Sequence, residues 1–126
     1  MEQQLEQIRE QQKQTWDTFA PGWKKWDDFV MNMIRPAGDE IIRQLKLKET
    51  DVVLDVATGT GEPGLSIAAI VKKGKVIGSD LSPVMLSVAK ENALKKGIKK
   101  TPSGIIIIKS RMCVKLSVDN KNRIIF

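Results

Sequence analysis

Acidic residues and a glycine-rich turn stand at the ends of two short apolar runs. Asp55 lies in the first run, Val52–Val56, and the turn Gly59–Gly64 follows it directly. Asp80 ends the second run. A carboxylate can accept hydrogen bonds from both vicinal hydroxyls of a ribose, and glycines let the backbone approach a ligand closely. The pattern predicts a site for a nucleoside-containing ligand.

The elements that position these residues alternate between strand and helix. The runs Val52–Val56 and Val76–Gly78 predict buried strands. Helices are expected at Leu65–Lys72 and over about Pro83–Lys96. Parallel strands joined by helices form a Rossmann-like α/β sheet, and both acids then lie at the carboxyl edge where ligands bind. The expected fold class is an incomplete Rossmann-like parallel sheet preceded by helices.

Helical periodicity precedes the sheet. Three helices are expected, at Met1–Phe19, Trp23–Met33 and Ala37–Leu47, because prolines interrupt the pattern between them. We therefore expect a helical cap over residues 1–48 and a partial Rossmann-like domain over residues 49–126.

The tail, residues 101–126, contains apolar runs that favour strands but indicate no topology. Ile105–Ile108 is the expected third strand. Val114–Val118 and Arg123–Phe126 flank a polar segment and predict a terminal hairpin.

The glycine spacing alone leaves the ligand open. Gly59-x-Gly61-x-x-Gly64 also satisfies the dinucleotide fingerprint. A pyrophosphate favours a helix N-terminus without carboxylates, whereas Glu62 opens this helix and Asp55 precedes the turn. S-adenosylmethionine carries a sulfonium and an α-ammonium group beside its ribose, which acids complement. The charges therefore favour S-adenosylmethionine over NAD or FAD.

Each residue also has a plainer interpretation. The glycines could form a strand-to-helix turn without a ligand, and Asp55 could hydrogen-bond that turn or cap the helix after it. Trp16, Phe19, Trp23 and Trp26 could be core residues of docked helices rather than a substrate cage. These alternatives stay open from the residues alone.

Two blocks of the sequence resemble class I S-adenosylmethionine-dependent methyltransferases of the ubiquinone/menaquinone-biosynthesis type, namely Val53–Glu62 and Val76–Leu86. The resemblance implies that the methionine end of the cofactor is lined by Asp55, Ala57, Gly59, Thr60 and Gly61. It further places Asp80 at the ribose and Leu81 and Met85 at the adenine. The segment Trp16–Trp23 is similar to the opening of that family, which implies a cap over the cofactor. The similarity covers roughly residues 15–98.

Composition excludes several functional classes. The chain has 21 Lys and Arg against 15 Asp and Glu, a net charge of +6, but the basic residues are scattered, so no specific nucleic-acid partner is expected. Histidine is absent, which removes the usual general base and the commonest zinc ligand, and no metal is expected. The single Cys113 and the absence of an apolar leader or membrane-length run favour a cytoplasmic protein without a transmembrane segment.

These observations lead to one functional hypothesis and two alternatives. We expect the cofactor-binding portion of a methyltransferase, apparently truncated, that transfers a methyl group to an unidentified small-molecule acceptor; no catalytic base is identifiable. One alternative is an inactive methyltransferase-like chain that acts as an interaction module and self-associates through an open sheet edge. The other is a fragment of a dinucleotide-binding oxidoreductase.

Overall fold

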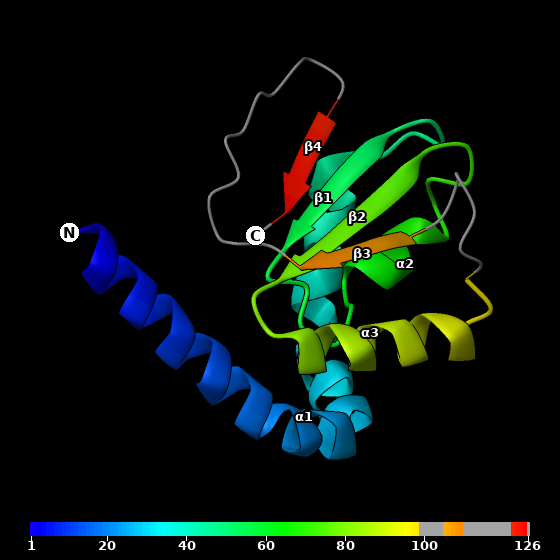
Figure 1. The fold of residues 1–126 in the computed structure, drawn as a ribbon. Coiled ribbons are helices and arrows are strands. Elements are labelled where there is room, and N and C mark those ends of the chain that lie inside the picture. Colours follow the sequence, from blue (N-terminus) through cyan, green and yellow to red (C-terminus); the bar gives the residue numbers. More distant parts are fainter. Residues whose placement is uncertain (99–104, 110–121, 126) are drawn as a thin grey trace.

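A computed structural model describes residues 1–98, 105–109 and 122–125 of the 126-residue chain. In chain order its elements are α1 (Glu2–Leu45), β1 (Val52–Val56), α2 (Gly64–Ala68), β2 (Lys75–Asp80), α3 (Pro83–Lys95), β3 (Ile105–Lys109) and β4 (Asn122–Ile125). The strands lie side by side, and the first turns of α1 project away from them (Figure 1).

The sheet is parallel throughout, with the strand order β3-β2-β1-β4. Val53 of β1 is in register with Val76 of β2, and Leu54 is in register with Ile124 of β4. The order changes direction at β1, because β2 and β3 extend to one side and β4 lies on the other. Such a reversal is where a ligand crevice forms at the carboxyl ends of the strands. The predicted Rossmann-like fold is confirmed.

The core lies between β1, β2 and the helices that follow them. Its buried side chains are Val53, Leu65, Ile67, Val71, Val76 and Ala93. The end of α1 packs on this core through Ile42 and Leu45. Alternate burial along β1 matches a strand with one face in the core, so the run of β-branched residues forms the strand that it predicts.

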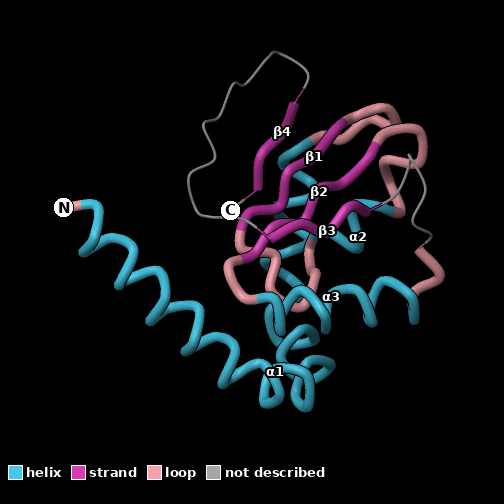
Figure 2. Tube along the Cα trace, viewed as in Figure 1, coloured by secondary structure: helices cyan, strands magenta, loops and turns pink. Residues whose placement is uncertain are grey.

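The prediction of three separate N-terminal helices is wrong. The structure has one continuous helix, α1, with Pro21 and Pro36 inside it. Figure 2 shows that α1 changes direction and turns back toward the sheet in its second half. A proline removes one backbone donor and bends a helix, but the turns on either side keep their own hydrogen bonds. The prolines therefore shape α1 without ending it.

Helix α2 is shorter than expected. It ends at Ala68 rather than Lys72. The chain beyond it tightens into turns, because the amide of Ile70 donates to the carbonyl of Ile67 (2.8 Å) and the amide of Gly74 to that of Val71 (3.0 Å). These i→i−3 bonds replace the helical pattern.

The expected third strand is confirmed as β3, which ends one residue later, at Lys109. The last expected strand is present as β4, and its partner among the described residues is β1, in parallel. The other arm of the predicted hairpin, residues 114–118, lies outside the described residues. Within the described part of the chain, no helix is long and apolar enough to cross a membrane.

Candidate functional site

The turn after β1 has an unusual backbone. Ala57 and Gly59 both have φ of +56°, and Gly61 has φ of +115°. A positive φ is rare for a residue with a Cβ, and such conformations gather at ligand sites. The amide of Thr58 donates to the carbonyl of Ser79 (2.9 Å), which fixes the turn against the end of β2. The turn after β1, residues 57–61, and the end of β2, residues 79–80, are therefore held together, and we call these residues the ledge.

Asp55 lies beneath this turn. Its side chain is buried, and its Oδ2 accepts hydrogen bonds from the hydroxyl of Thr58 (2.7 Å) and the amide of Gly64 (3.2 Å). Burial raises the pKa of Asp55 to about 6, against the lowering effect of these two hydrogen bonds. These contacts are the ones that the plainer interpretation assigns to Asp55, since they brace the turn from below.

Asp80 lies on the upper side of the ledge. Its Oδ2 accepts a hydrogen bond from the amide of Gly59 (2.9 Å) and its Oδ1 accepts one from the amide of Ser82 (2.9 Å). Each carboxylate oxygen has a second lone pair, so both can still accept a hydroxyl. The backbone thus holds the carboxylate of Asp80 in a fixed orientation at the end of β2.

A cavity of about 360 Å³ opens above the ledge. Six of the predicted site residues line it, namely Ala57, Gly59, Thr60, Asp80, Leu81 and Met85. Asp55 and Gly61 do not line it. A Cβ on Gly61 would lie 2.7 Å from Cδ1 of Leu65, so this glycine allows α2 to pack closely under the turn. The structure therefore divides the predicted site into a cavity wall and its support.

Helix α1 supplies the opposite wall. Its contributing residues are Ile8, Arg9, Gln12, Trp16, Trp23 and Met31. Trp16 and Trp23 lie together with ring centroids 6.4 Å apart, and both line the cavity opposite the ledge. Phe19 is mostly exposed, and Ala20 is completely buried. Sequence reasoning missed Ile8, Gln12 and Met31, because a residue far away in the chain gives no local signal of the ledge it faces.

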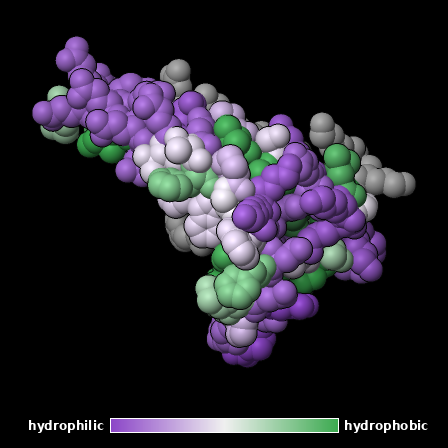
Figure 3. All heavy atoms as spheres, turned by 90° about the horizontal axis from the view of Figure 1, so that it is seen from below, coloured by the Kyte–Doolittle hydropathy of each residue, from purple (hydrophilic) through white to green (hydrophobic). Residues whose placement is uncertain are grey.

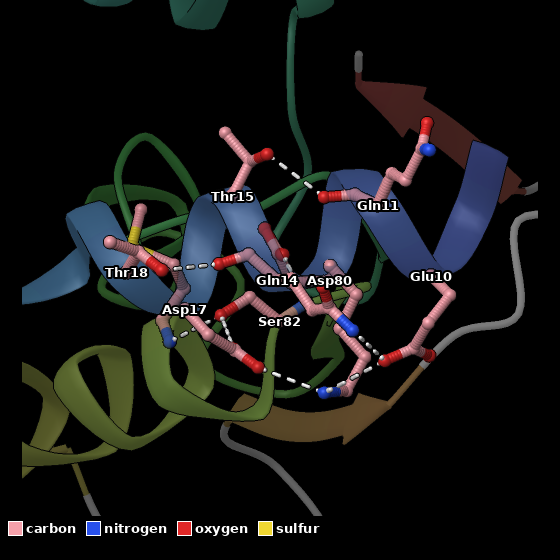
Figure 4. Close-up of polar contacts among 10 residues, drawn as sticks. Glu10, Gln11, Gln14, Thr15, Asp17, Thr18, Asp80 and Ser82 are labelled. Atoms are coloured by element: carbon pink, nitrogen blue, oxygen red, sulfur yellow. Dashed lines mark hydrogen bonds and ion pairs between the residues drawn. The ribbon is translucent and has the colours of Figure 1, made fainter. Parts of the chain in front are cut away.

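A polar contact ties α1 to the start of α3. The hydroxyl of Ser82 donates to Oδ1 of Asp17 (Figure 4). Nζ of Lys13 lies 2.9 Å from the other carboxylate oxygen of Asp17. Burial opposes the ionisation of Asp17, but the hydrogen bonds from Ser82 and Lys13 outweigh it and lower the pKa of this carboxyl group. Because Ser82 also bonds Asp80, the helix and the ledge share one hydrogen-bonded chain.

The acids around the cavity differ in their charge balance. Glu62 lines the cavity, but its Oε1 pairs with Lys96 (3.0 Å) and its Oε2 accepts the amide of Ser66 (3.0 Å). The carboxylate of Asp80 accepts its two hydrogen bonds from backbone amides rather than from a cation. The lining of the cavity thus brings together two acids of the sheet side, Glu62 and Asp80, and one basic residue of α1, Arg9.

Comparison with known proteins identifies the segment that carries this site. A family model described as "Methyltransferase domain" matches residues 47–105, which include the ledge and α3. A solved S-adenosylmethionine-dependent methyltransferase from Aquifex aeolicus is 32% identical, with a TM-score of 0.51, over 59% of this chain and 38% of that protein. Residues 47–105 of this chain are thus similar to a methyltransferase domain, and the chain resembles part of a solved S-adenosylmethionine-dependent methyltransferase.

Two curated methyltransferases also match part of this chain. The release factor glutamine methyltransferase of Deinococcus radiodurans is 42% identical over 57 residues, which are 45% of this chain and 20% of that protein. The ubiquinone/menaquinone biosynthesis C-methyltransferase of Syntrophotalea carbinolica is 48% identical over 48 residues, 38% of this chain and 20% of that protein. The methyltransferase segment thus spans about a fifth of these relatives, whose names give different acceptors.

Proposed function

We propose that the cavity binds S-adenosylmethionine, and that the chain provides the cofactor-binding part of a methyltransferase with a small-molecule acceptor. The observation that carries the proposal is the juxtaposition of Asp80, an apolar wall at Leu81 and Met85, and the ledge of positive-φ residues around one cavity. Its volume of about 360 Å³ lies within the range of small-molecule sites.

The residues present fit this cofactor. Asp80 offers two oriented oxygens for the vicinal hydroxyls of a ribose, and Leu81 and Met85 offer an apolar surface for a flat base. Ala57, Gly59 and Thr60 would lie along the methionine end. In this proposal Asp55 and Gly61 act from below, by holding the ledge in shape.

The chain's own contribution to the chemistry is alignment. When bound, the cofactor would supply a sulfonium methyl group for transfer to a nucleophilic acceptor atom, with S-adenosylhomocysteine as the leaving group. The ledge would fix the cofactor, while Trp16 and Trp23 of α1 would cover it and exclude water. Holding two reactants in line removes much of the entropic barrier, so such a transfer needs no protein nucleophile.

We also propose the domain organisation expected from the sequence. Residues 1–48 would form the cap, and residues 49–126 would form the cofactor-binding domain. The single cysteine supports a cytoplasmic location, where thiols stay reduced.

The test is isothermal titration of the purified chain with S-adenosylhomocysteine, with NAD as the competing ligand. Saturable binding of S-adenosylhomocysteine, lost in Asp80→Ala, would support the proposal. Asp39→Ala is the matched control, because Asp39 is an exposed acid on α1 outside this cavity.

Two results would contradict the proposal. A folded chain that binds neither ligand would leave only the family relationship and favour an interaction module. Binding of NAD in preference would favour the dinucleotide alternative.

A further inference from the structure

The side-chain amide of Asn92 joins two parts of the molecule that are far apart in the sequence. Asn92 lies on α3, and its Nδ2 donates to Oδ2 of Asp27 on α1 (3.0 Å) and to the carbonyl of Thr60 in the ledge (3.0 Å). The amide nitrogen has two hydrogens, so both bonds form at once. One side chain therefore bonds both the helix that supplies one wall of the cavity and a residue of the other wall, Thr60.

The contact with Asp27 sets the position of the α1 wall. Trp23 precedes Asp27 by four residues and Met31 follows it by four, so all three lie on one face of the helix. Both of these neighbours line the cavity. Fixing Asp27 thus fixes the helical face that presents Trp23 and Met31.

The carboxylate of Asp27 depends on this amide. Among the residues that the structure describes, Oδ1 of Asp27 is buried and has no hydrogen-bond partner. Oδ2 is satisfied by Asn92. A buried carboxylate without any donor is costly, so the loss of Asn92 would drive Asp27, and α1 with it, toward water.

The contact with Thr60 sets the position of the ledge. Thr60 is buried and lies in the cavity wall. When Asn92 holds the Thr60 carbonyl, the next amide, of Gly61, points the opposite way and donates to the carbonyl of Thr58 (2.9 Å). The orientation of this peptide decides which backbone groups face the cavity.

We propose that Asn92 is a positioning residue, which couples α1 to the glycine ledge and so holds both walls of the cavity in register. The effect on affinity rests on the proposed function, whereas the coupling itself does not. Lys24 and Glu91 offer a matched contact between the same two helices, 2.6 Å apart but half-exposed and outside the lining of the cavity. An exposed pair of this kind contributes little.

The experiment compares three variants with the wild-type chain. Asn92→Ala removes both bonds. The double variant, Asp27→Asn with Asn92→Asp, restores an amide–carboxylate pair between α1 and α3 but leaves no donor for the Thr60 carbonyl. Glu91→Gln is the control. Each is measured by hydrogen exchange of the ligand-free chain, at peptides covering residues 16–31 and 57–64, and by titration with S-adenosylhomocysteine.

We expect Asn92→Ala to accelerate exchange in both peptides and to weaken binding about tenfold or more, the usual effect of losing a hydrogen bond to a charged group. The double variant should recover protection against hydrogen exchange in α1 only, and its binding of S-adenosylhomocysteine should stay weak. Glu91→Gln should match the wild type.

Two outcomes would overturn the inference. If Asn92→Ala resembles Glu91→Gln, Asn92 couples nothing. If the double variant regains wild-type protection against hydrogen exchange in both peptides, Asn92 only joins two helices. A wild type that fails to bind S-adenosylhomocysteine would reject the proposed function. The hydrogen-exchange rates would still decide whether Asn92 couples α1 to the ledge. The double variant also keeps the test decisive if Asn92→Ala does not fold.

Discussion

The sheet with α2 and α3 is held together in a different way from α1. Almost every core side chain belongs to the first part, whereas Ala20 is the only fully buried residue among the 44 residues of α1. Hydrophilic residues cover most of the projecting turns of α1 (Figure 3). α1 is fastened instead by polar contacts at Asp17 and Asp27 and by the apolar residues near its end. One wall of the cavity is therefore set by core packing, and the other by a few hydrogen bonds together with the packed end of α1.

The sharpest test of this comparison replaces the same residue type in each part. Ile67→Ala should lower the free energy of unfolding by about 2–5 kcal/mol, because Ile67 is completely buried in the core. Ile34→Ala on α1, where 45% of the side chain is exposed, should change it by less than about 0.5 kcal/mol. Urea unfolding followed by circular dichroism measures both. Equal losses would show that α1 is as tightly packed as the sheet.

The two parts should also respond to pH in opposite directions. The raised pKa of Asp55, about 6, means that its stabilising contribution is present below pH 3.8 and is lost as the pH rises through 6. Relative to Asp55→Asn, the wild type should therefore lose up to about 3 kcal/mol between pH 4 and 7. Thermal unfolding over this pH range measures the difference.

Asp17 provides the opposite slope for that experiment. Its pKa is lowered, so its contribution is present above pH 3.8 and is lost as the pH falls. Relative to Asp17→Asn, the wild type should gain stability as the pH rises from 3. Slopes of the same sign for Asp17→Asn and Asp55→Asn would contradict the burial assigned to Asp55.

Glycine-to-alanine substitutions in the two parts should change the free energy of unfolding in opposite directions. Gly61→Ala should cost about 1–3 kcal/mol, because its φ of +115° is strained for alanine and the new Cβ would meet Leu65. Gly22→Ala meets no atom within 4 Å and should stabilise α1 by up to about 1 kcal/mol. Differential scanning calorimetry measures both shifts. A stabilising Gly61→Ala would rule out the described ledge.

The smallest expected effect concerns self-association. Within the described residues, the outer edges of β3 and β4 have no partner strand, while α1 exposes Trp26 and Phe29. We expect weak, concentration-dependent dimers through a sheet edge. Sedimentation velocity should then give the same result for the wild type and for Trp26→Ser. Loss of association in Trp26→Ser would assign it to α1 instead.

The sequence predicted the sheet part well. β1 has the predicted bounds, β2 ends at the predicted Asp80, and α3 ends just before Gly97, whose positive φ terminates it. These boundaries come from local physics, namely β-branched runs, a proline in the first turn and a glycine stop. Local signals of this kind are readable from residue types alone.

The sequence predicted α1 and part of the site less well. Pro21 and Pro36 indicated breaks, but a proline inside an exposed helix leaves enough bonds for it to continue. The distinction between Asp80 on the cavity wall and Asp55 beneath it depends on side-chain direction. The role that we propose for Asn92 depends on two contacts 65 and 32 residues away. None of these features leaves a periodic trace in the chain.

The tryptophans are distributed unequally between the two parts. All three, Trp16, Trp23 and Trp26, lie on α1, and the chain has no tyrosine. Ultraviolet emission excited at 295 nm therefore comes from α1 alone, and the sheet is optically silent. Two of the indoles face the cavity and the third is mostly in solvent. The protein thus carries a built-in fluorescent reporter for the wall that is held by hydrogen bonds.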